Sequence, residues 1–321
     1  MLLSILAVIS GFAVLIWGAD RFVYGAAATA RNLGVSPLVI GLTIVGIGTS
    51  APEILVSAIA AYNGNPAIAV GNALGSNITN IALVLGVTAI TVPLLVKSDT
   101  LKREYPIMFL VMMLALVLCL DGTLSRIDGA ILLTGLVIMI YWMVRLGLRK
   151  HETDQLETEF EQEIPYITTP KAIFWLALGM ILLLLSSKAL VWGAVNIAHT
   201  FGISDLVIGL TIVAIGTSLP ELAASVMSAL KGEPDIALGN VIGSNMFNLL
   251  AVLGIPGLIA PHALDPAVLT RDFPFMIGFT IAMFIMAFGF KESGRINRLE
   301  GAILVMGYIG YMVVLYYTAT P

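Results

Sequence analysis

Charged residues and cysteine are both scarce in this chain of 321 residues. Only 11% of the residues are charged and 59% are hydrophobic, whereas a soluble domain has about 25% charged and about 45–50% apolar residues. So few charges cannot cover the surface of a soluble protein of this length, and we therefore expect a membrane protein. The single cysteine, Cys119, excludes an intramolecular disulfide and a cysteine-based metal site. The net charge of -4 argues against nucleic acid as a partner.

Long apolar segments recur along the whole chain, and a helix that crosses a membrane needs about 20 mainly apolar residues. The first segment lacks the basic start of a signal peptide, and its apolar stretch is too long for one. The sequence therefore predicts an all-α membrane protein with ten transmembrane helices. The ten predicted segments are 2–24, 37–61, 67–92, 105–120, 127–146, 171–196, 205–230, 235–260, 273–290 and 298–317.

Lys and Arg are distributed unevenly between the segments that connect these helices. If the N-terminus is outside, about twelve of them lie in inner loops, whereas only Arg126 and Arg271 lie in outer loops. Because inner loops carry the excess of positive charge, we expect both termini to face outward.

One hydrophilic and acidic linker, residues 147–170, separates the fifth and sixth predicted helices. We interpret it as a solvated cytoplasmic connector that is too short to fold as a domain, and a regulatory cation site is the alternative. The linker divides the chain into two units of five helices each, residues 1–146 and 171–321.

The two units contain an internal repeat. Residues 38–86 and 206–254 agree at 29 of 49 positions without a gap, at an offset of 168. Because each unit holds five helices, an odd number, the second copy enters the membrane from the opposite face. Inverted repeats of this kind are typical of secondary transporters, which bind their substrate near the midplane of the membrane. The agreement includes polar residues inside apolar helices, which helix packing alone does not require.

The first polar motif of the repeat is GTSAPE at 48–53 and GTSLPE at 216–221. It places Glu53 and Glu221 deep in the membrane, where a carboxylate costs about 3 kcal/mol and indicates a functional site. A salt bridge to Arg21 or Lys188, the two basic residues within the predicted helices, is the structural alternative.

Each motif also contains a proline that predicts a helix broken near the midplane. Pro52 and Pro220 release the carbonyls of Gly48 and Gly216, because proline has no N–H and clashes with the carbonyl four residues earlier. Such released groups are tolerated in a membrane where they line a cavity or find another partner.

The second polar motif is GNxxGSNxxN at 71–80 and 239–248. Residues four apart share one helix face, which pairs Ser76 with Asn80 and Ser244 with Asn248. For the other four asparagines, hydrogen bonding between helices is at least as good an interpretation as ion binding. These four are Asn72, Asn77, Asn240 and Asn245.

The predicted site thus contains carboxylates, amide oxygens, hydroxyls and released carbonyls. The three histidines, His151, His199 and His262, lie in loops or at helix ends. A shell made only of oxygen selects hard cations, and Ca²⁺ takes 6–8 such ligands. Two glutamates balance one Ca²⁺ or at least two Na⁺ or H⁺, so these ions compete, and competition with alternating access gives exchange.

Together, the paired GTSxPE and GSNxxN motifs resemble the cation/Ca²⁺ exchanger superfamily, and most closely its prokaryotic sodium/calcium exchangers. The resemblance implies a Ca²⁺/Na⁺ antiporter of the prokaryotic inner membrane, with no enzymatic activity and no resident cofactor. It also implies that the protein is functional as a monomer, with lipid and inorganic cations as its partners, and that the first and sixth helices slide across the other eight. The implied ligands are Glu53, Glu221, Thr49, Ser50, Ser76, Asn80, Thr217, Ser218 and Ser244, with the backbone carbonyls of Gly46 and Ala214.

Asn248 departs from the family pattern, which has an aspartate at this position. We retain it as a ligand, although one ionisable group is missing. Antiport coupled to H⁺, or dependent on K⁺, is therefore the main alternative on the same fold. A cation channel is a weaker alternative because of the inverted repeat, and a membrane hydrolase is weaker still because no HExxH motif occurs.

Overall fold

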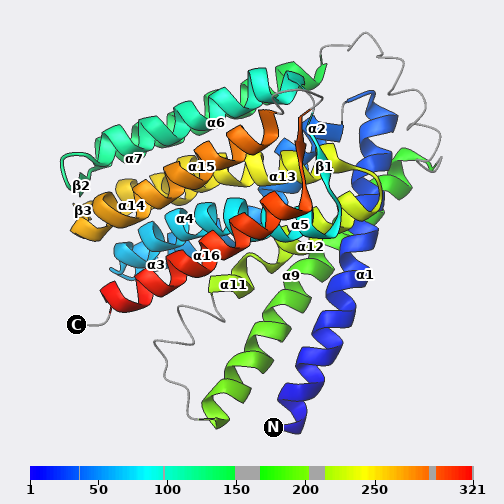
Figure 1. Ribbon diagram of the computed structural model, residues 1–321, viewed down its shortest axis with the longest axis horizontal. Coiled ribbons are helices and arrows are strands. Elements are labelled where there is room, and N and C mark those ends of the chain that lie inside the picture. The colour runs from blue at the N-terminus through cyan, green and yellow to red at the C-terminus, as the bar shows by residue number, and fades with distance from the viewer. Residues whose placement is uncertain (36, 97, 149–166, 202–213, 289–293, 320–321) are drawn as a thin grey trace.

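The computed structural model describes residues 1–35, 37–96, 98–148, 167–201, 214–288 and 294–319 (Figure 1). Most of these residues are helical, and eight helices among them are long and apolar enough to cross a membrane. The α-helices are α1 (Leu2–Leu33), α2 (Pro37–Ile40), α3 (Gly46–Tyr62), α4 (Pro66–Thr79), α5 (Gly86–Thr91), α6 (Ser98–Cys119), α7 (Arg126–Leu148), α9 (Thr169–Thr200), α11 (Ala214–Thr217), α12 (Leu219–Leu230), α13 (Pro234–Phe247), α14 (Gly254–Ile259), α15 (Phe273–Phe288) and α16 (Arg298–Ala319). The π-helical segments are η1 (Gly41–Val45), η2 (Asn80–Leu85), η4 (Asn248–Val252) and η5 (Val268–Asp272), and the strands are β1 (Leu94–Leu95), β2 (Thr123–Leu124), β3 (His262–Ala263) and β4 (Arg295–Ile296).

Helical structure occurs in each of the ten predicted segments, with two differences in extent. The first helix continues to Leu33, well beyond the predicted end at 24, because its alanine-rich continuation favours a helix until Gly34 caps it with φ 63°. The predicted segment 205–230 is described only from residue 214, and its apolar helix Leu219–Leu230 is shorter than the eight spanning candidates, as is Glu104–Cys119. Residues 149–166 of the predicted acidic linker lie outside the described residues.

The turns that precede the asparagine motifs are built alike in the two halves of the chain. Gly64 and Gly232 follow α3 and α12 with φ 79° and 77°, a conformation that favours glycine. Pro66 and Pro234 then occupy the first positions of α4 and α13, where a missing N–H costs nothing. The same local chemistry therefore produces the same helix–turn–helix unit twice.

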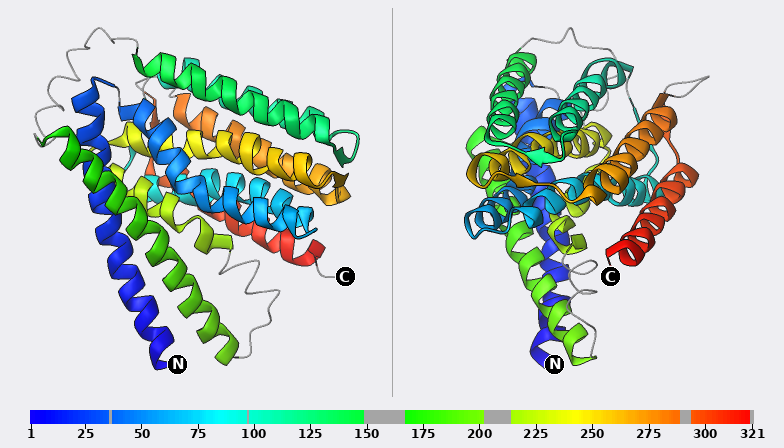
Figure 2. Two further views of the ribbon diagram at one scale, coloured as in Figure 1. Left: turned by 180° about the vertical axis from the view of Figure 1, so that it is seen from behind. Right: turned by 90° about the vertical axis from the view of Figure 1, so that its left-hand side faces the viewer.

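Helices α1 and α9 form an antiparallel pair that extends beyond the other helices (Figures 1 and 2). Gly11 of α1 faces Ser186 and Leu190 of α9, whereas Gly25 faces Ala172 and Leu176, so residue numbers rise along one helix and fall along the other. Small residues seven positions apart line this contact, and they allow the backbones to approach closely. They are Ser4, Gly11, Gly18 and Gly25 in α1, and Ala172, Gly179, Ser186 and Gly193 in α9.

The remaining helices exchange contacts reciprocally between the two halves. Strand β1 pairs with β4, and β2 pairs with β3, in antiparallel two-stranded ladders. Gly86 packs against Gly301, and its repeat counterpart Gly254 packs against Gly129. A contact that recurs with the partners exchanged is the property of a two-fold interface.

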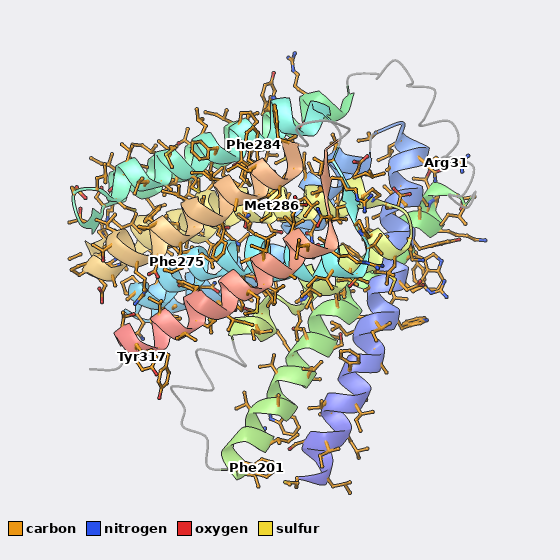
Figure 3. The ribbon with its side chains drawn as sticks, in the orientation of Figure 1. Arg31, Phe201, Phe275, Phe284, Met286 and Tyr317 are labelled. Atoms are coloured by element: carbon orange, nitrogen blue, oxygen red, sulfur yellow. The ribbon has the colours of Figure 1, made fainter. Side chains whose placement is uncertain are left out.

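The centre of this arrangement is occupied by the helices that carry the asparagine motifs. Within the apolar stretch Pro234–Ile259, residues 235–254 are all buried, and Pro66–Thr91 is mostly buried. Large hydrophobic side chains are exposed at the periphery, including Phe201 after α9 and Tyr317 near the end of α16 (Figure 3). A buried centre that carries polar residues, inside an apolar exterior, is expected for a protein that is surrounded by lipid.

Candidate cation site

The two proline-containing segments fold differently. Helix α3 continues through Pro52, so the predicted break is wrong for the first copy, where a π-helical turn, η1, precedes α3 instead. In the second copy, Ser218 leaves the helix with φ -91° and ψ 6°, and α12 begins at Leu219. Pro220 thus lies in the first turn of a new helix, where its missing N–H is not needed.

The carbonyl that Pro220 releases has a partner outside its own helix. The hydroxyl of Ser187 in α9 donates a hydrogen bond to the carbonyl of Gly216 at 2.7 Å. The sequence predicts the released carbonyl but not this partner. Ser187 therefore connects the α1–α9 pair directly to the segment that carries Glu221.

Both glutamates are buried, each with only 1% of its surface exposed. One carboxylate oxygen of Glu53 and both oxygens of Glu221 have no hydrogen-bond partner among the described residues. The two carboxylates are close enough for their charges to interact, and Thr49 and Ser50 of α3 lie beside Glu221. A pair of like charges in an apolar interior needs a cation or protons to neutralise it.

The alternative of a salt bridge does not apply to these glutamates. Arg21 pairs with Asp20 at 3.6 Å and lies over the rings of Trp17 and Trp175. Lys188 is exposed on α9. The two basic residues therefore belong to the periphery of the protein.

Two of the asparagines hold the glutamate helices in place. The side-chain N–H groups of Asn72 donate to the Glu53 carbonyl and to Ser57, both at 3.2 Å. In the second copy, Asn240 donates to the Glu221 carbonyl at 3.2 Å and to Ser225 at 2.9 Å. These asparagines are hydrogen-bonding links between helices, as the structural alternative for them predicts.

Asn80 and Asn248 occupy a different kind of position, at the first residue of η2 and of η4. Such π-helical segments occur frequently at functional sites. Asn80 Oδ1, together with both polar atoms of the Asn248 amide, has no partner in the described part of the chain, and the same holds for the Ser50 and Ser218 hydroxyls. Helix α3, which carries Glu53, contacts η4, which begins with Asn248, and α12, which carries Glu221, contacts η2, which begins with Asn80. Each glutamate therefore lies on a helix that contacts the asparagine segment of the other copy.

Two more predicted ligands meet across the halves. The Thr49 and Ser244 hydroxyls are 3.4 Å apart, and both contact Asn240 Oδ1, at 3.1 Å and 3.4 Å. Gly46 brings the backbones together here, because a Cβ on it would lie 3.3 Å from the backbone of Gly243 and Ser244.

The last three predicted ligands lie on α4 and α11. Ser76 is buried in α4, and Thr217 is partly buried at the end of α11. Ala214 is the first residue of α11. Their assignment as ligands stays a prediction.

The polar atoms of the cluster are mainly oxygen donors. The described residues contain no group of three or more His, Cys, Asp and Glu side chains that could hold a metal ion. What the cluster offers is two carboxylates among neutral oxygen donors, the ligands that hard cations prefer.

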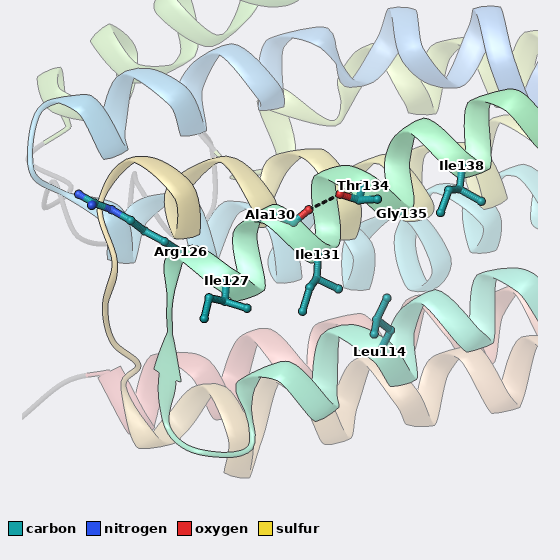
Figure 4. Close-up of a pocket in the computed structure, with 8 residues that line it drawn as sticks. All are labelled: Leu114, Arg126, Ile127, Ala130, Ile131, Thr134, Gly135 and Ile138. Carbon is teal, nitrogen blue, oxygen red and sulfur yellow. Dashed lines mark hydrogen bonds between the residues drawn. The ribbon is translucent and has the colours of Figure 1, made fainter.

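A surface groove lies elsewhere, between α6 and α7 (Figure 4). Leu114, Ile127, Ile131 and Ile138 line it, and the Thr134 hydroxyl is bound to the Ala130 carbonyl of its own helix. Side chains of this kind on the outside of a membrane protein contact lipid, so the groove is separate from the cation site.

Sequence reasoning missed the close pairing of α1 with α9 and the position of Ser187. A signal for the pairing is present in the sequence, because small residues recur every seven positions in both helices, at the repeat offset of 168. Ser187 has no such signal, since its repeat counterpart is Ala19.

The chain is similar in sequence and in fold to known membrane proteins. The sodium/calcium exchanger protein family matches residues 3–145 and 171–317. The chain is 54% identical over 317 residues to the putative antiporter CaxA of Alkalimonas amylolytica, covering 98% of this chain and 99% of the relative. It is 41% identical over 320 residues to the inner membrane protein YrbG of Escherichia coli, covering 99% and 98%. The sodium-calcium exchanger NCX_Mj, soaked with 2.5 mM Na⁺ and 0.1 mM Ca²⁺, matches with a TM-score of 0.84 and 34% identity, covering 98% of this chain and 99% of that chain.

Proposed function

This chain belongs to the sodium/calcium exchanger family, and we propose that it exchanges Ca²⁺ for Na⁺ across the membrane by alternating access. It is an integral membrane protein and a cation/Ca²⁺ antiporter, not an enzyme. Na⁺ as the coupling ion is our proposal, and so is the inner membrane of a prokaryotic cell as its location, which the name of the Escherichia coli relative supports.

One observation carries the proposal, namely a set of buried oxygen-bearing side chains that is repeated in the two halves. Each half contributes a serine, a glutamate and an asparagine with polar atoms that have no partner among the described residues: Ser50, Glu53 and Asn80 from one half, and Ser218, Glu221 and Asn248 from the other. A soluble or structural protein would satisfy such groups internally, because each unmade hydrogen bond costs about 1–3 kcal/mol. Transported cations satisfy them instead and neutralise the carboxylates.

We further propose the inverted-repeat topology, with ten transmembrane helices, units at 1–146 and 171–321, and both termini outside. The antiparallel direction of α1 and α9 supports it, because they begin the two units and would run parallel if the units were inserted in the same sense. The exchanged strand pairs support the two-fold relation between the units. The family match also falls into two parts, separated by residues 146–170.

All twelve predicted ligands remain in the proposed site. The ions are bound by carboxylates, by hydroxyls and amide oxygens, and by two backbone carbonyls, and the protein is functional as a monomer. The ligands are Glu53, Glu221, Thr49, Ser50, Ser76, Asn80, Thr217, Ser218, Ser244, Asn248, Gly46 and Ala214.

The second candidate is antiport coupled to H⁺, or dependent on K⁺, and Asn248 is the observation that favours it. With an amide at this position, the buried cluster has two carboxylates, so fewer monovalent ions neutralise it than in a site with three.

Flux of ⁴⁵Ca²⁺ into proteoliposomes tests both candidates, with the Na⁺, K⁺ and H⁺ gradients imposed one at a time. Uptake driven by an outward Na⁺ gradient at equal pH supports Na⁺ coupling. Uptake that needs only a pH gradient shows that H⁺ is the coupling ion. Saturable counterflow distinguishes either antiporter from a channel.

A further inference from the structure

An asparagine that binds a cation has a requirement that an aspartate does not have. Its amide has one carbonyl oxygen, which attracts a cation, and one NH₂ group, which repels it. A carboxylate presents an oxygen at either end. A site that uses Asn80 and Asn248 as ligands therefore needs a neighbour that accepts from each NH₂ group and turns the oxygen toward the ions.

Asn245 has this relation to Asn80. The Asn245 side-chain N–H points to the thioether of Met108, with a nitrogen–sulfur distance of 3.9 Å, and a thioether can only accept. The opposite end of the amide, Asn245 Oδ1, accepts from Asn80 Nδ2 at 3.4 Å. Asn80 Oδ1 is thereby left as a buried acceptor without a partner in the described part of the chain.

The repeat supplies a second set of the same residues. Asn77 donates to the thioether of Met276 at 3.5 Å, as the repeat counterpart of Asn245 and Met108. Asn77 Oδ1 and both polar atoms of the Asn248 amide are buried and unpaired within the described residues. Helix α4, which carries Asn77, contacts η4, which begins with Asn248. The two-fold arrangement therefore provides Asn77 Oδ1 as the acceptor for the Asn248 amide. In this conformation the hydrogen bond between them is not formed.

The two asparagine–methionine pairs share a small cavity between α6, α15 and the asparagine helices. Asn77, Asn245, Met108 and Met276 all line it. All four side chains are nearly inaccessible to solvent. The two pairs therefore belong to one buried cluster.

We propose that Asn245 and Asn77 are positioning residues that orient the amides of Asn80 and Asn248, so that carbonyl oxygens face the transported cations. The Asn77–Asn248 hydrogen bond forms when a cation binds to Asn248 Oδ1. This inference rests on the proposed function, because it assigns a role within the same cation site.

The test is a double-mutant cycle between the positioning residue and the ligand. Asn77→Leu keeps the size of the side chain and removes the acceptor, so we expect Ca²⁺ affinity to fall about tenfold, as for one lost buried hydrogen bond. In an Asn248→Asp background, the same Asn77→Leu change should alter the affinity less than twofold, because a carboxylate needs no orientation. Asn245→Leu should show the same dependence on Asn80→Asp.

Equilibrium binding of ⁴⁵Ca²⁺ to the purified protein gives the affinities, and flux in proteoliposomes gives KM and kcat separately. Asn72→Leu is the matched control, since Asn72 bonds the Glu53 backbone and Ser57, and its effect should be the same in both backgrounds. Alanine at positions 77 and 245 repeats the cycles with smaller side chains if a leucine variant does not fold.

The outcomes separate the inference from the function on which it rests. Equal losses for Asn77→Leu with Asn248 and with aspartate at 248 would show a packing role and overturn the inference. No loss in either background would also overturn it. A wild-type protein that neither binds nor exchanges Ca²⁺ would refute the proposed function itself. Normal wild-type exchange, with no interaction between positions 77 and 248 in the double-mutant cycle, would refute the inference alone.

Discussion

Replacing one site glutamate with glutamine tests the charge of the site while keeping its shape. Glu53→Gln and Glu221→Gln each remove one of the two carboxylates and leave an amide of the same size. If these carboxylates compensate the dehydration of Ca²⁺, either variant should fold normally and lose Ca²⁺ transport. The two variants should be equally affected, because the repeat gives the residues equivalent roles.

The burial of the glutamates determines the expected size of the loss. An exposed ion pair contributes about 0–1 kcal/mol, whereas removing one partner of a buried pair costs about 3–5 kcal/mol. Each glutamate is only 1% exposed, and no basic side chain among the described residues bonds to it. The larger value therefore applies, and at about 1.4 kcal/mol per factor of ten it corresponds to a loss of about 100- to 4,000-fold in Ca²⁺ affinity.

The assay is Na⁺-driven ⁴⁵Ca²⁺ uptake by proteoliposomes, together with equilibrium ⁴⁵Ca²⁺ binding by the purified variants. Glu300→Gln makes the same chemical change at the start of α16, where Glu300 accepts from the Asn297 N–H at 2.8 Å. This control should keep its uptake within about a factor of two of the wild type, because glutamine still accepts this hydrogen bond and Glu300 lies outside the cation cluster. Near-normal affinity in Glu53→Gln or Glu221→Gln would refute the proposed site.

Three further changes test other parts of the proposal. Asn248→Asp adds a third carboxylate that needs another proton or monovalent cation. Ca²⁺ flux should therefore become more dependent on pH across about pH 6–8, or on Na⁺, without being lost. Unchanged pH and Na⁺ profiles of the flux would mean that this side chain faces away from the ions. Ser187→Ala removes the 2.7 Å hydrogen bond to the Gly216 carbonyl. If this bond contributes about 1 kcal/mol in one conformation only, its loss should shift the apparent Ca²⁺ affinities about fivefold, in opposite directions on the two membrane faces. Affinities equal to those of the wild type would show that the bond is made in both conformations. If the acidic linker is a solvated connector, as the sequence predicts, neutralising it should leave Ca²⁺ affinity and flux within about a factor of two, because charges in solvent are screened over about 8–10 Å. A loss of flux at normal expression would indicate regulation. The linker substitutions are Glu157, Glu159, Glu161 and Glu163 to Gln.

The helices and the burial of the two glutamates could be predicted from the sequence because each has a strong local signal. Apolar length gives the membrane helices, and a carboxylate in the middle of such a segment stands out against its cost. The repeat adds weight, since Glu53 and Glu221 occur in matching motifs. Local signals also place Pro66 and Pro234 at the starts of their helices.

Features that depend on tertiary contacts could not be predicted in this way. The sequence motif treats Pro52 and Pro220 alike, yet only the second copy breaks its helix, at Ser218. The division of the asparagines into interhelical links and unpaired amides follows from which residues face a methionine, a serine or the opposite copy. The hydrogen bond of Ser187 joins residues 29 positions apart and has no counterpart in the repeat.

The place where the two-fold symmetry fails is itself informative about transport. In a symmetric arrangement, if Gly48 faces α9, then its counterpart Gly216 faces α1. Both glycines instead face α9, through Met180 and Val191 respectively. The symmetry thus holds in the strand pairs and in the Gly86–Gly301 and Gly129–Gly254 contacts, and fails where the α1–α9 pair touches the glutamate segments. Under the proposed inverted topology, the two copies of the site are equivalent toward the two sides of the membrane. An asymmetric contact of the α1–α9 pair would then give the site one orientation at a time. Under the proposed alternating access, the opposite state repeats this contact with the roles of α1 and α9 exchanged.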